Sequence, residues 1–195
     1  MSSTVETASL DNAWEELQTL WDAMEAGREP TREFPDTRWR PGKAFEYLII
    51  RGFELSGADV RPAFSVVLDI GISEQIDGAV YVAGLSCLIE AKDLRAGRMD
   101  GDKARVTADP IAKLRNQLMR RHASVIGLLF SRSGYTAPAL TMAHFLAPQA
   151  VLLWDKPEIA YALATRDFVR PLLLKYRANV EMGLPFFNVL EAALA

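Results

Sequence analysis

Three charged residues, Asp77, Glu90 and Lys92, have the types and the spacing of a site that holds a metal ion. Glu90 and Lys92 stand two apart at the end of an apolar run, so on a strand both would point to the same face of the sheet. A turn centred on Ala83 and Gly84 would place Asp77 directly opposite Glu90 in an antiparallel pair. Opposed carboxylates destabilise a sheet unless a positive charge compensates them. We therefore expect a bound cation beside these two acids.

This register depends on the length of the turn. Ala is unfavourable at the first central position of a two-residue turn, because φ is positive there. A four-residue loop centred on Ala83 and Gly84 would keep Asp77 opposite Glu90, whereas a loop of odd length would offset the two carboxylates diagonally.

The chemistry that such a pair of acids suits best is hydrolysis of a phosphodiester. Mg²⁺ takes oxygen ligands and needs only one or two protein carboxylates, because waters and phosphate oxygens complete its shell. The backbone carbonyl of Ala91 would add one more oxygen. The metal would stabilise charge on the phosphate and lower the pKa of its water. Lys92, on the same face as Glu90, would hold the attacking water or help to deprotonate it.

Hydrophobic periodicity predicts the elements that must position these residues. The predicted elements are a helix at 43–55, strands at 60–68, 76–82 and 85–91, a helix capped by Asp109 with Pro110 in its first turn, a strand at 125–130, a helix at 138–146 and a strand at 151–154. Their alternation predicts an α/β fold with a mixed sheet flanked by helices on both faces.

Segments on either side of this core have a different character. An amphipathic helix is expected at 10–26, followed by a charged, proline-rich linker at 28–42. Residues 157–195 are predicted to form helices interrupted at Pro171 and Pro185. We therefore divide the chain into an acidic N-terminal helix and linker (1–41), a core (42–156) and a C-terminal helical cap (157–195).

The composition is that of a globular protein: 195 residues, 50% hydrophobic and 24% charged. The longest apolar stretch, 137–154, is interrupted by prolines and polar residues, so no membrane span is expected. A single cysteine cannot form an internal disulfide, and the N-terminus lacks the pattern of a signal peptide, which favours a reducing cytoplasm.

Charge is distributed unevenly along the chain, whose formal net charge is −3. Residues 1–26 hold six acids and no Lys or Arg, whereas residues 93–121 hold eight basic residues against four acidic ones. The second segment is either a basic surface next to the predicted site or simply a solvated charged loop. The acidic N-terminal helix would then either shield such a surface or dock a partner.

An acid, a hairpin and the triplet Glu90-Ala91-Lys92 resemble the active-site signature of the PD-(D/E)XK nuclease superfamily, which has the restriction-endonuclease-like fold. Two further motifs agree, because "GKAFEYLI" places Glu46 on the preceding helix and "PIAKLRNQLMRR" places Gln117 on the following one. The stretch "LLFSRSGYTAPAL" is similar to the Mrr group. The resemblance covers residues 42–156 and implies the core order α, β, β, β, α, β. The proline of the family's name is replaced here by Ile76.

This resemblance implies a Mg²⁺-dependent deoxyribonuclease, with Mn²⁺ as a substitute, that acts in restriction, defence or repair. It assigns the metal to Asp77, Glu90 and the Ala91 carbonyl, with Glu46 as a further candidate ligand. Lys92 would position the water and Gln117 would support the site. Three arginines on the helix after the triplet would contact phosphates: Arg115, Arg120 and Arg121.

Other interpretations of the same residues stay open. Glu90 and Lys92 could form a solvated strand end, Asp77 with Gly78 a turn, and Glu46 an exposed helix position. The whole chain could be a catalytically silent nucleic-acid-binding or assembly module of the same fold. It could also be an endonuclease that acts only with a partner, for example in phage defence. A homodimer is favoured if both strands of DNA are cut, and the sequence does not distinguish DNA from RNA.

Overall fold

The computed structural model describes residues 2–28, 42–67, 71, 73–94, 105–146 and 150–193. Its elements in chain order are α1 (Ser2–Glu25), α2 (Lys43–Leu55), β1 (Asp59–Val67), β2 (Ser73–Val82), β3 (Leu85–Lys92), α3 (Ala108–Leu118), β4 (Val125–Ser131), α4 (Ala137–His144), β5 (Val151–Trp154), α5 (Lys156–Ala164), α6 (Val169–Met182) and α7 (Val189–Ala193). Residues 29–41 of the predicted linker fall outside the described residues, and so do residues 95–104 of the charged connection after β3.

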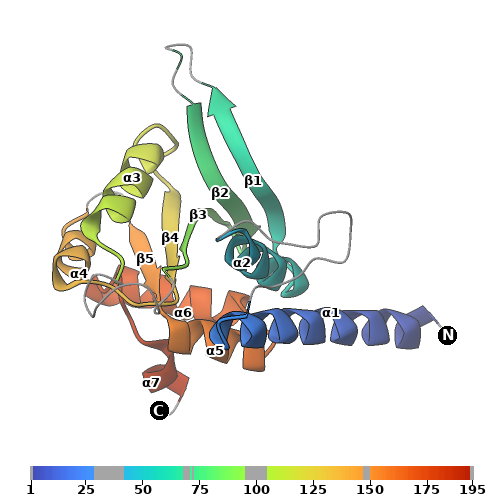
Figure 1. Cartoon of the computed structure of the whole chain (residues 1–195). Coiled ribbons are helices and arrows are strands. Elements are labelled where there is room, and N and C mark those ends of the chain that lie inside the picture. Colours follow the sequence, from blue (N-terminus) through green and yellow to red (C-terminus); the bar gives the residue numbers. More distant parts are fainter. Residues whose placement is uncertain are drawn as a thin grey trace.

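Within the described residues the strands form one sheet in the order β1-β2-β3-β4-β5 (Figure 1). The first three strands are antiparallel neighbours, and β3, β4 and β5 run parallel. Parallel neighbours need crossover connections, which α3 and α4 provide here. The predicted fold class is therefore confirmed, as is the order α, β, β, β, α, β of the predicted core.

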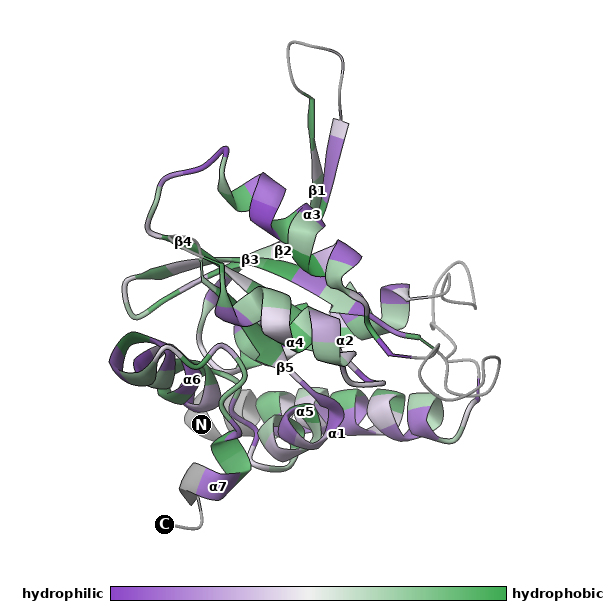
Figure 2. Ribbon diagram, turned by 90° about the vertical axis from the view of Figure 1, so that its left-hand side faces the viewer, coloured by the Kyte–Doolittle hydropathy of each residue, from purple (hydrophilic) through white to green (hydrophobic). Residues whose placement is uncertain are grey.

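Hydrophobic cores lie on both faces of this sheet. One core, beneath α1, α2, α5 and α6, contains Phe45, Phe53 and Trp154, each fully buried. The other lies beneath α3 and α4 and contains Ile111 and Leu129. Strands buried on both sides carry apolar residues on both faces, and Figure 2 shows the sheet largely in green where helices cover it. Because α3 packs on one face and α2 on the other, residues of both helices can reach the end of β3.

The acidic helix α1 packs on the α2 side of the sheet through Trp14, Leu17 and Trp21. It therefore lies on the face away from α3 and does not cover the described arginines of that helix. Its last residue, Glu25, accepts a hydrogen bond of 2.8 Å from the Nη2 atom of Arg132. The structure thus favours a packing role for α1 over the shielding role considered from the sequence.

Two details of the helices differ from the sequence-based expectation. The N-cap of α3 is Thr107, so Asp109 lies in the first turn and is not the cap. Pro171 does not interrupt a helix, because it lies in the first turn of α6, where the missing N–H would have no helical partner. The break instead precedes α6, near Arg166, which has a φ of 54°.

The hairpin between β2 and β3 has the predicted register. Val82 lies opposite Leu85, and pairing continues to Gly78 opposite Ile89. The turn contains only Ala83 and Gly84, with φ values of 49° and 80°. Ala83 thus adopts the left-handed conformation that a two-residue turn requires, despite the clash of its Cβ atom with the backbone.

We expect Ala83→Asn to stabilise the protein by about 1 kcal/mol, because Asn tolerates a left-handed conformation better than Ala and Asn-Gly is the favoured pair in this turn. Ala83 is exposed, so the new side chain displaces nothing from the core. Chemical denaturation would measure the gain. Ala83→Val serves as the opposite control, because a β-branched residue at positive φ should destabilise the same turn.

Candidate active site

The β2 strand leaves β3 at Asp77. Pairing between β2 and β3 ends at Gly78, whereas β2 continues with β1 as far as Ser73 opposite Val67, and the two strands extend together beyond the rest of the sheet (Figure 1). The β1–β2 ladder also skips Asp77. Ile76 and Ala79 lie in the same core although residues three apart on a regular strand face opposite ways. The strand therefore bends at Asp77, just past the last pair with β3.

This bend places the Asp77 carboxylate beside the end of β3. Its Oδ2 atom accepts a hydrogen bond of 3.0 Å from the backbone N–H of Ala91, the residue after Glu90. The Asp77 carboxylate thus accepts a hydrogen bond from a backbone N–H of β3 beyond the point where the ladder with β2 ends. The hairpin keeps the predicted register as far as Gly78 opposite Ile89, but Asp77 and Glu90 do not form the predicted ladder pair, and the Asp77 side chain contacts the backbone of Ala91, next to Glu90.

Gly78 lets α2 approach this part of the sheet. A Cβ atom at this position would lie 2.2 Å from the Cδ1 atom of Ile50 and 3.2 Å from the carbonyl oxygen of Arg61. Ile50 lies four residues after Glu46 on α2, so both side chains are on the same face of the helix. The close approach at Gly78 therefore brings the Glu46 side of α2 toward Asp77, and the sequence-based choice of a strand over a turn at Asp77-Gly78 is confirmed.

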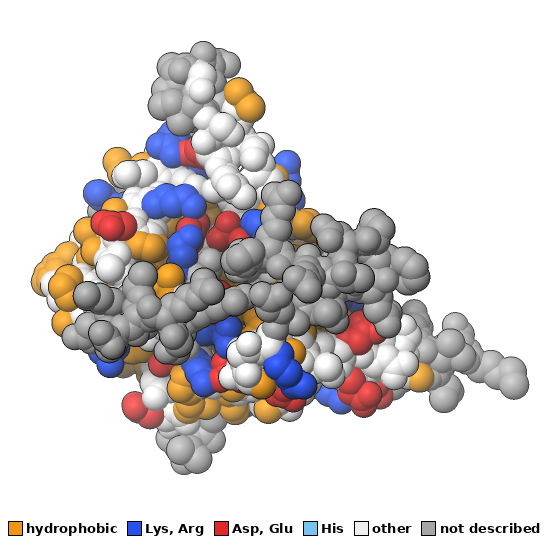
Figure 3. All heavy atoms as spheres, viewed as in Figure 1, with side chains coloured by type: hydrophobic (Ala, Val, Ile, Leu, Met, Phe, Trp, Pro, Cys, Tyr) orange, Lys and Arg blue, Asp and Glu red, His pale blue; other side chains and the backbone are white. Residues whose placement is uncertain are grey.

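Glu90 is fully buried and its carboxylate contacts two lysines. The Nζ atom of Lys113 donates to both carboxylate oxygens, at 3.0 and 2.8 Å, and the Nζ atom of Lys92 lies 2.5 Å from Oε1. An unpaired carboxylate in such a position would carry a desolvation cost of several kcal/mol. Two ammonium groups therefore compensate Glu90 here, and acidic and basic side chains gather between α3 and β2 in Figure 3.

The electrostatics connect Asp77 to Glu90 and to α2. Burial raises the pKa of Asp77, and the charge of Glu90 raises it further, against the lowering effects of the Ala91 N–H and of nearby lysines. Burial also raises the pKa of Glu46, which the charge of Asp77 raises further and the charges of Lys43 and Lys92 lower. Glu46 on α2 and Asp77 on β2 are therefore close enough to charged groups at the end of β3 for those charges to shift their pKa values.

Ionised Asp77 should therefore cost stability at neutral pH. An acid whose pKa is raised on folding stabilises the folded state below its ordinary pKa of 3.8, and this contribution is lost as pH rises through the folded-state pKa. We expect Asp77→Asn to raise the unfolding free energy of the metal-free protein at pH 7 but not near pH 3, because Asn can still accept the Ala91 N–H.

Denaturation curves at the two pH values would measure this difference. The matched control is Asp59→Asn, which changes an exposed aspartate on the neighbouring strand and should alter stability little at either pH. Equal stability of Asp77→Asn and wild type at pH 7 would contradict the assigned ionisation cost.

Gln117 reaches the site region through the backbone of β2. Its Nε2 atom donates a hydrogen bond of 3.1 Å to the carbonyl oxygen of Gln75, two residues before Asp77. Its Oε1 atom is buried and has no hydrogen-bond partner among the described residues. Gln117 therefore holds the part of β2 that has left β3, and by this contact helps to place Asp77.

Two residues of this region were not singled out from the sequence, Lys113 and Glu74. Lys113 lies four residues before Gln117, and this helical spacing, which puts both on one face of α3, was the available signal. Glu74 is buried and forms ion pairs with Arg120 and Arg121, the latter at 2.8 Å. Nothing local in the sequence marks that contact, because it joins residues 47 positions apart.

Two of the three arginines expected to contact phosphates already form ion pairs with a carboxylate of the protein. Arg120 and Arg121 share the carboxylate of Glu74. The Nε atom of Arg115 is buried and has no hydrogen-bond partner among the described residues. Contact of these three side chains with a nucleic acid stays a prediction.

The groups here that could hold a metal are carboxylate oxygens, which suit a hard cation that needs few protein ligands. In the described part of the chain, no group of three or more His, Cys, Asp or Glu side chains lies close enough to hold a metal ion. Asp77 and Glu90 still supply the one or two carboxylates that Mg²⁺ requires when waters and phosphate oxygens complete its shell. The oxygens of Glu90 are bound by Lys113, so a metal at this carboxylate would have to replace those hydrogen bonds.

Among the described residues, no helix combines the length and the hydrophobicity that a bilayer crossing needs.

Cys87, which strand alternation places on the face of β3 opposite Glu90, is 1% exposed and lies in the core beneath α2. Burial raises the pKa of its thiol to about 12. This burial makes Cys87 part of the apolar core, as a small hydrophobic residue with a protonated thiol.

Comparison with known proteins finds distant structural likeness only. No family model matches the sequence, and no curated protein matches it. Three solved structures are similar. The first is AF1548, a protein of unknown function, with 14% identity and a TM-score of 0.43 over 68% of this chain and 76% of that one. The second is the MspJI restriction endonuclease in complex with a 27-mer oligonucleotide, with 18% identity and a TM-score of 0.43 over 80% of this chain and only 31% of that one.

The third is the small subunit of the heterodimeric restriction endonuclease R.BspD6I, with 16% identity and a TM-score of 0.48 over 85% of each chain. This chain thus spans less than a third of the length of MspJI but most of the length of the other two. Likenesses this distant carry no conclusion about activity or partners, which depend on the site itself.

Proposed function

We propose that this protein is a Mg²⁺-dependent endonuclease that hydrolyses phosphodiester bonds of DNA, and that it is a member of the PD-(D/E)XK superfamily. The observation that carries the proposal is the fully buried Glu90, which lies beside Asp77 and is contacted by Lys92. Two acids and a lysine at one strand end are costly to a fold, since burial penalises each charge. A catalytic role explains why the chain carries all three.

In this proposal Asp77, Glu90 and the Ala91 carbonyl would hold the metal, and Glu46, which does not group with these two acids closely enough to be a third carboxylate ligand, would act on the attacking water. A metal held there would supply positive charge to the phosphate and would lower the pKa of a bound water. The chain's own residues position the reactants. The Nζ atom of Lys92 holds the attacking water or a phosphate oxygen beside Glu90, and the carboxylate of Glu46, whose pKa is raised, is suited to accept a proton from that water.

Lys113 has a different part in this scheme. Its Nζ atom donates to both oxygens of Glu90 and its side chain is 45% exposed, so a cation held by Glu90 would have to replace these hydrogen bonds. Gln117 keeps the bent part of β2 in position through the carbonyl of Gln75.

Removal of the metal tests the proposal directly. We expect the purified protein to cut plasmid DNA with Mg²⁺ or Mn²⁺ and to lose the activity completely in EDTA, because both carboxylates then lack a cation to activate water. Agarose gels that separate supercoiled, nicked and linear plasmid would measure cutting. Cleavage that persists in EDTA would rule out the metal mechanism.

The second candidate is a catalytically silent nucleic-acid-binding or assembly module of the same fold. It is favoured by the ion pairs of Glu90 with Lys92 and Lys113, which compensate this carboxylate without a metal. Under this candidate, DNA binding would be the same with Mg²⁺ and with EDTA, and no cleavage would occur under either condition. The plasmid experiment above, joined to a binding assay, therefore separates the two.

A further inference from the structure

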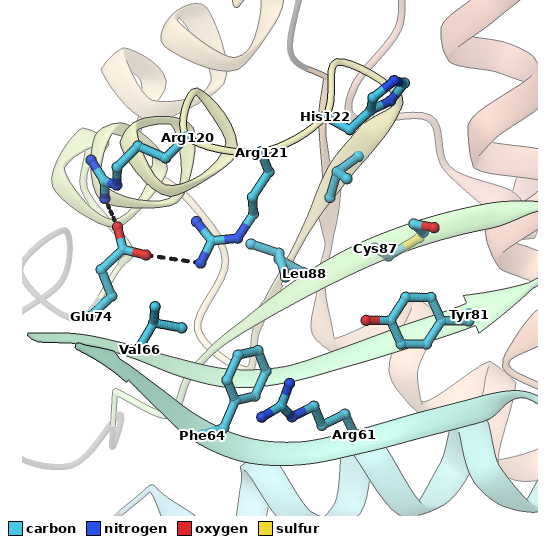
Figure 4. Close-up of a pocket in the computed structure, with 12 residues that line it drawn as sticks. Arg61, Phe64, Val66, Glu74, Tyr81, Cys87, Leu88, Arg120, Arg121 and His122 are labelled. Atoms are coloured by element: carbon cyan, nitrogen blue, oxygen red, sulfur yellow. Dashed lines mark hydrogen bonds and ion pairs between the residues drawn. The ribbon is translucent and has the colours of Figure 1, made fainter. Parts of the chain in front are cut away.

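A pocket of about 480 Å³ opens between the C-terminal end of α3 and the sheet face formed by β1, β2 and β3 (Figure 4). Aromatic, basic and small apolar side chains line it together. Figure 4 shows Arg61, Phe64 and Tyr81 pointing into this space from the sheet and Arg121 pointing toward it from the α3 side. Its size lies within the roughly 300–1,000 Å³ of pockets that take one small molecule or one group of a larger ligand.

The pocket adjoins the candidate active site along β3. Leu88 lines the pocket and lies two residues before Glu90, so both side chains are on the face of β3 that α3 covers. Two residues of a strand span about 7 Å. The same pocket is bordered by Glu74, three residues before Asp77 on β2. A ligand chain that passes through the active site can therefore place a neighbouring group in this pocket.

The pocket offers stacking surfaces for a flat ring. Tyr81 is 45% exposed on the sheet face, and the guanidinium of Arg61 lies 3.9 Å from the centroid of the Phe64 ring. Leu88 adds an apolar wall. Exposed aromatic rings and guanidinium planes are the groups on which unstacked nucleobases bind, and each such contact contributes about 1–3 kcal/mol.

The charge of the lining favours an anion. Three arginines line the pocket against one carboxylate, Glu74, which binds Arg120 and Arg121 and so fixes their guanidinium groups at its border. Arg61 makes no ion pair with any described residue. The lining therefore keeps a net positive charge beside the stacking surfaces, which is the combination that binds a base together with its phosphate.

We infer that this pocket binds one unpaired nucleotide of the DNA strand that enters the active site, and that the substrate is single-stranded or locally unpaired DNA. The inference rests on the proposed nuclease function and adds the substrate class to it. A base within a duplex is stacked on both faces, so it cannot stack on Tyr81 or Phe64. An unpaired base inserts between the sheet and α3, and its phosphate contacts Arg61 and Arg121.

Binding in EDTA tests this inference without any cleavage. Fluorescence anisotropy would compare a labelled single-stranded DNA, the duplex of the same sequence and the corresponding RNA. We expect single-stranded DNA to bind at least about tenfold more tightly than duplex, and Tyr81→Ala and Arg61→Ala each to weaken its binding about fivefold or more. The matched control is Phe145→Ala, which removes an aromatic ring that is 83% exposed and does not line the pocket.

Outcomes of this experiment are distinct from those of the plasmid experiment. Equal binding of duplex and single strand, or unchanged binding by both pocket variants, would overturn the inference even if Mg²⁺-dependent cleavage is observed. Tighter binding of RNA would overturn the assignment to DNA. Selective binding of single-stranded DNA that depends on Tyr81 and Arg61, in a protein that never cleaves, would support the pocket and reject the nuclease.

Discussion

Lys92→Met should lower the rate of DNA cleavage by about 10²–10³-fold at saturating Mg²⁺, because removing one preorganised donor at the reacting water or phosphate costs a rate factor of that size. The loss should be in the chemical step. Lys92 is 31% exposed and Glu90 keeps its two hydrogen bonds from Lys113, so the variant should remain folded. Single-turnover cleavage of plasmid DNA would measure the rate, and denaturation would verify the fold.

The sharpest control for this prediction is Lys113→Met. Both lysines contact the same buried carboxylate, so both substitutions remove one positive charge from Glu90. Only Lys92 lies on the strand beside the proposed metal position, and we expect Lys113→Met to keep most of the activity. An equal loss in the two variants would mean that the lysines only compensate charge, and robust cutting by Lys92→Met would eliminate the proposed mechanism.

Lys175→Met should destabilise the protein by about 3–5 kcal/mol, the cost of leaving one member of a buried ion pair without its partner. The Nζ atom of Lys175 is 2.5 Å from Oε1 of Glu158, and both side chains are nearly inaccessible to solvent, at 0% and 2% exposure. Lys175 also donates to the carbonyl oxygen of Phe187 at 2.6 Å. The pair thus connects α5, α6 and the segment that leads into α7.

The double variant Lys175→Met/Glu158→Gln should recover much of this loss. Burial raises the pKa of Glu158 and lowers that of Lys175, so desolvation opposes both charges. The amide that replaces the Glu158 carboxylate would keep an oxygen for the N–H of Val189. Chemical denaturation would measure all variants. The exposed pair Arg177–Glu181 supplies the control, since Arg177→Met should cost less than about 1 kcal/mol. A similar cost for Lys175→Met would contradict the prediction.

Local patterns in the sequence determined most of the elements and the central hairpin. Residues 43–55 form the predicted helix because their apolar positions repeat at helical spacing and a glycine lies at the N-cap. The register that leads from Ala83 and Gly84 toward Asp77 and Glu90 follows from turn length and strand alternation, which involve only neighbouring residues. The types and order of the candidate site residues were therefore accessible without coordinates.

Contacts between residues distant in the chain were decided by the tertiary structure alone. The ion pair of Lys113 with Glu90 requires α3 to cross over β3, and the pair of Arg121 with Glu74 requires β2 to bend away from β3 at Asp77. Periodicity assigns a residue to a face but not to a partner on another element. The same limit applies to α1, whose place opposite α3 depends on which apolar surface of the folded core was left to cover. Long-range packing therefore determined the partners of the candidate site residues, including Lys113 and Glu74, and local sequence determined the types and order of those on α2, β2 and β3.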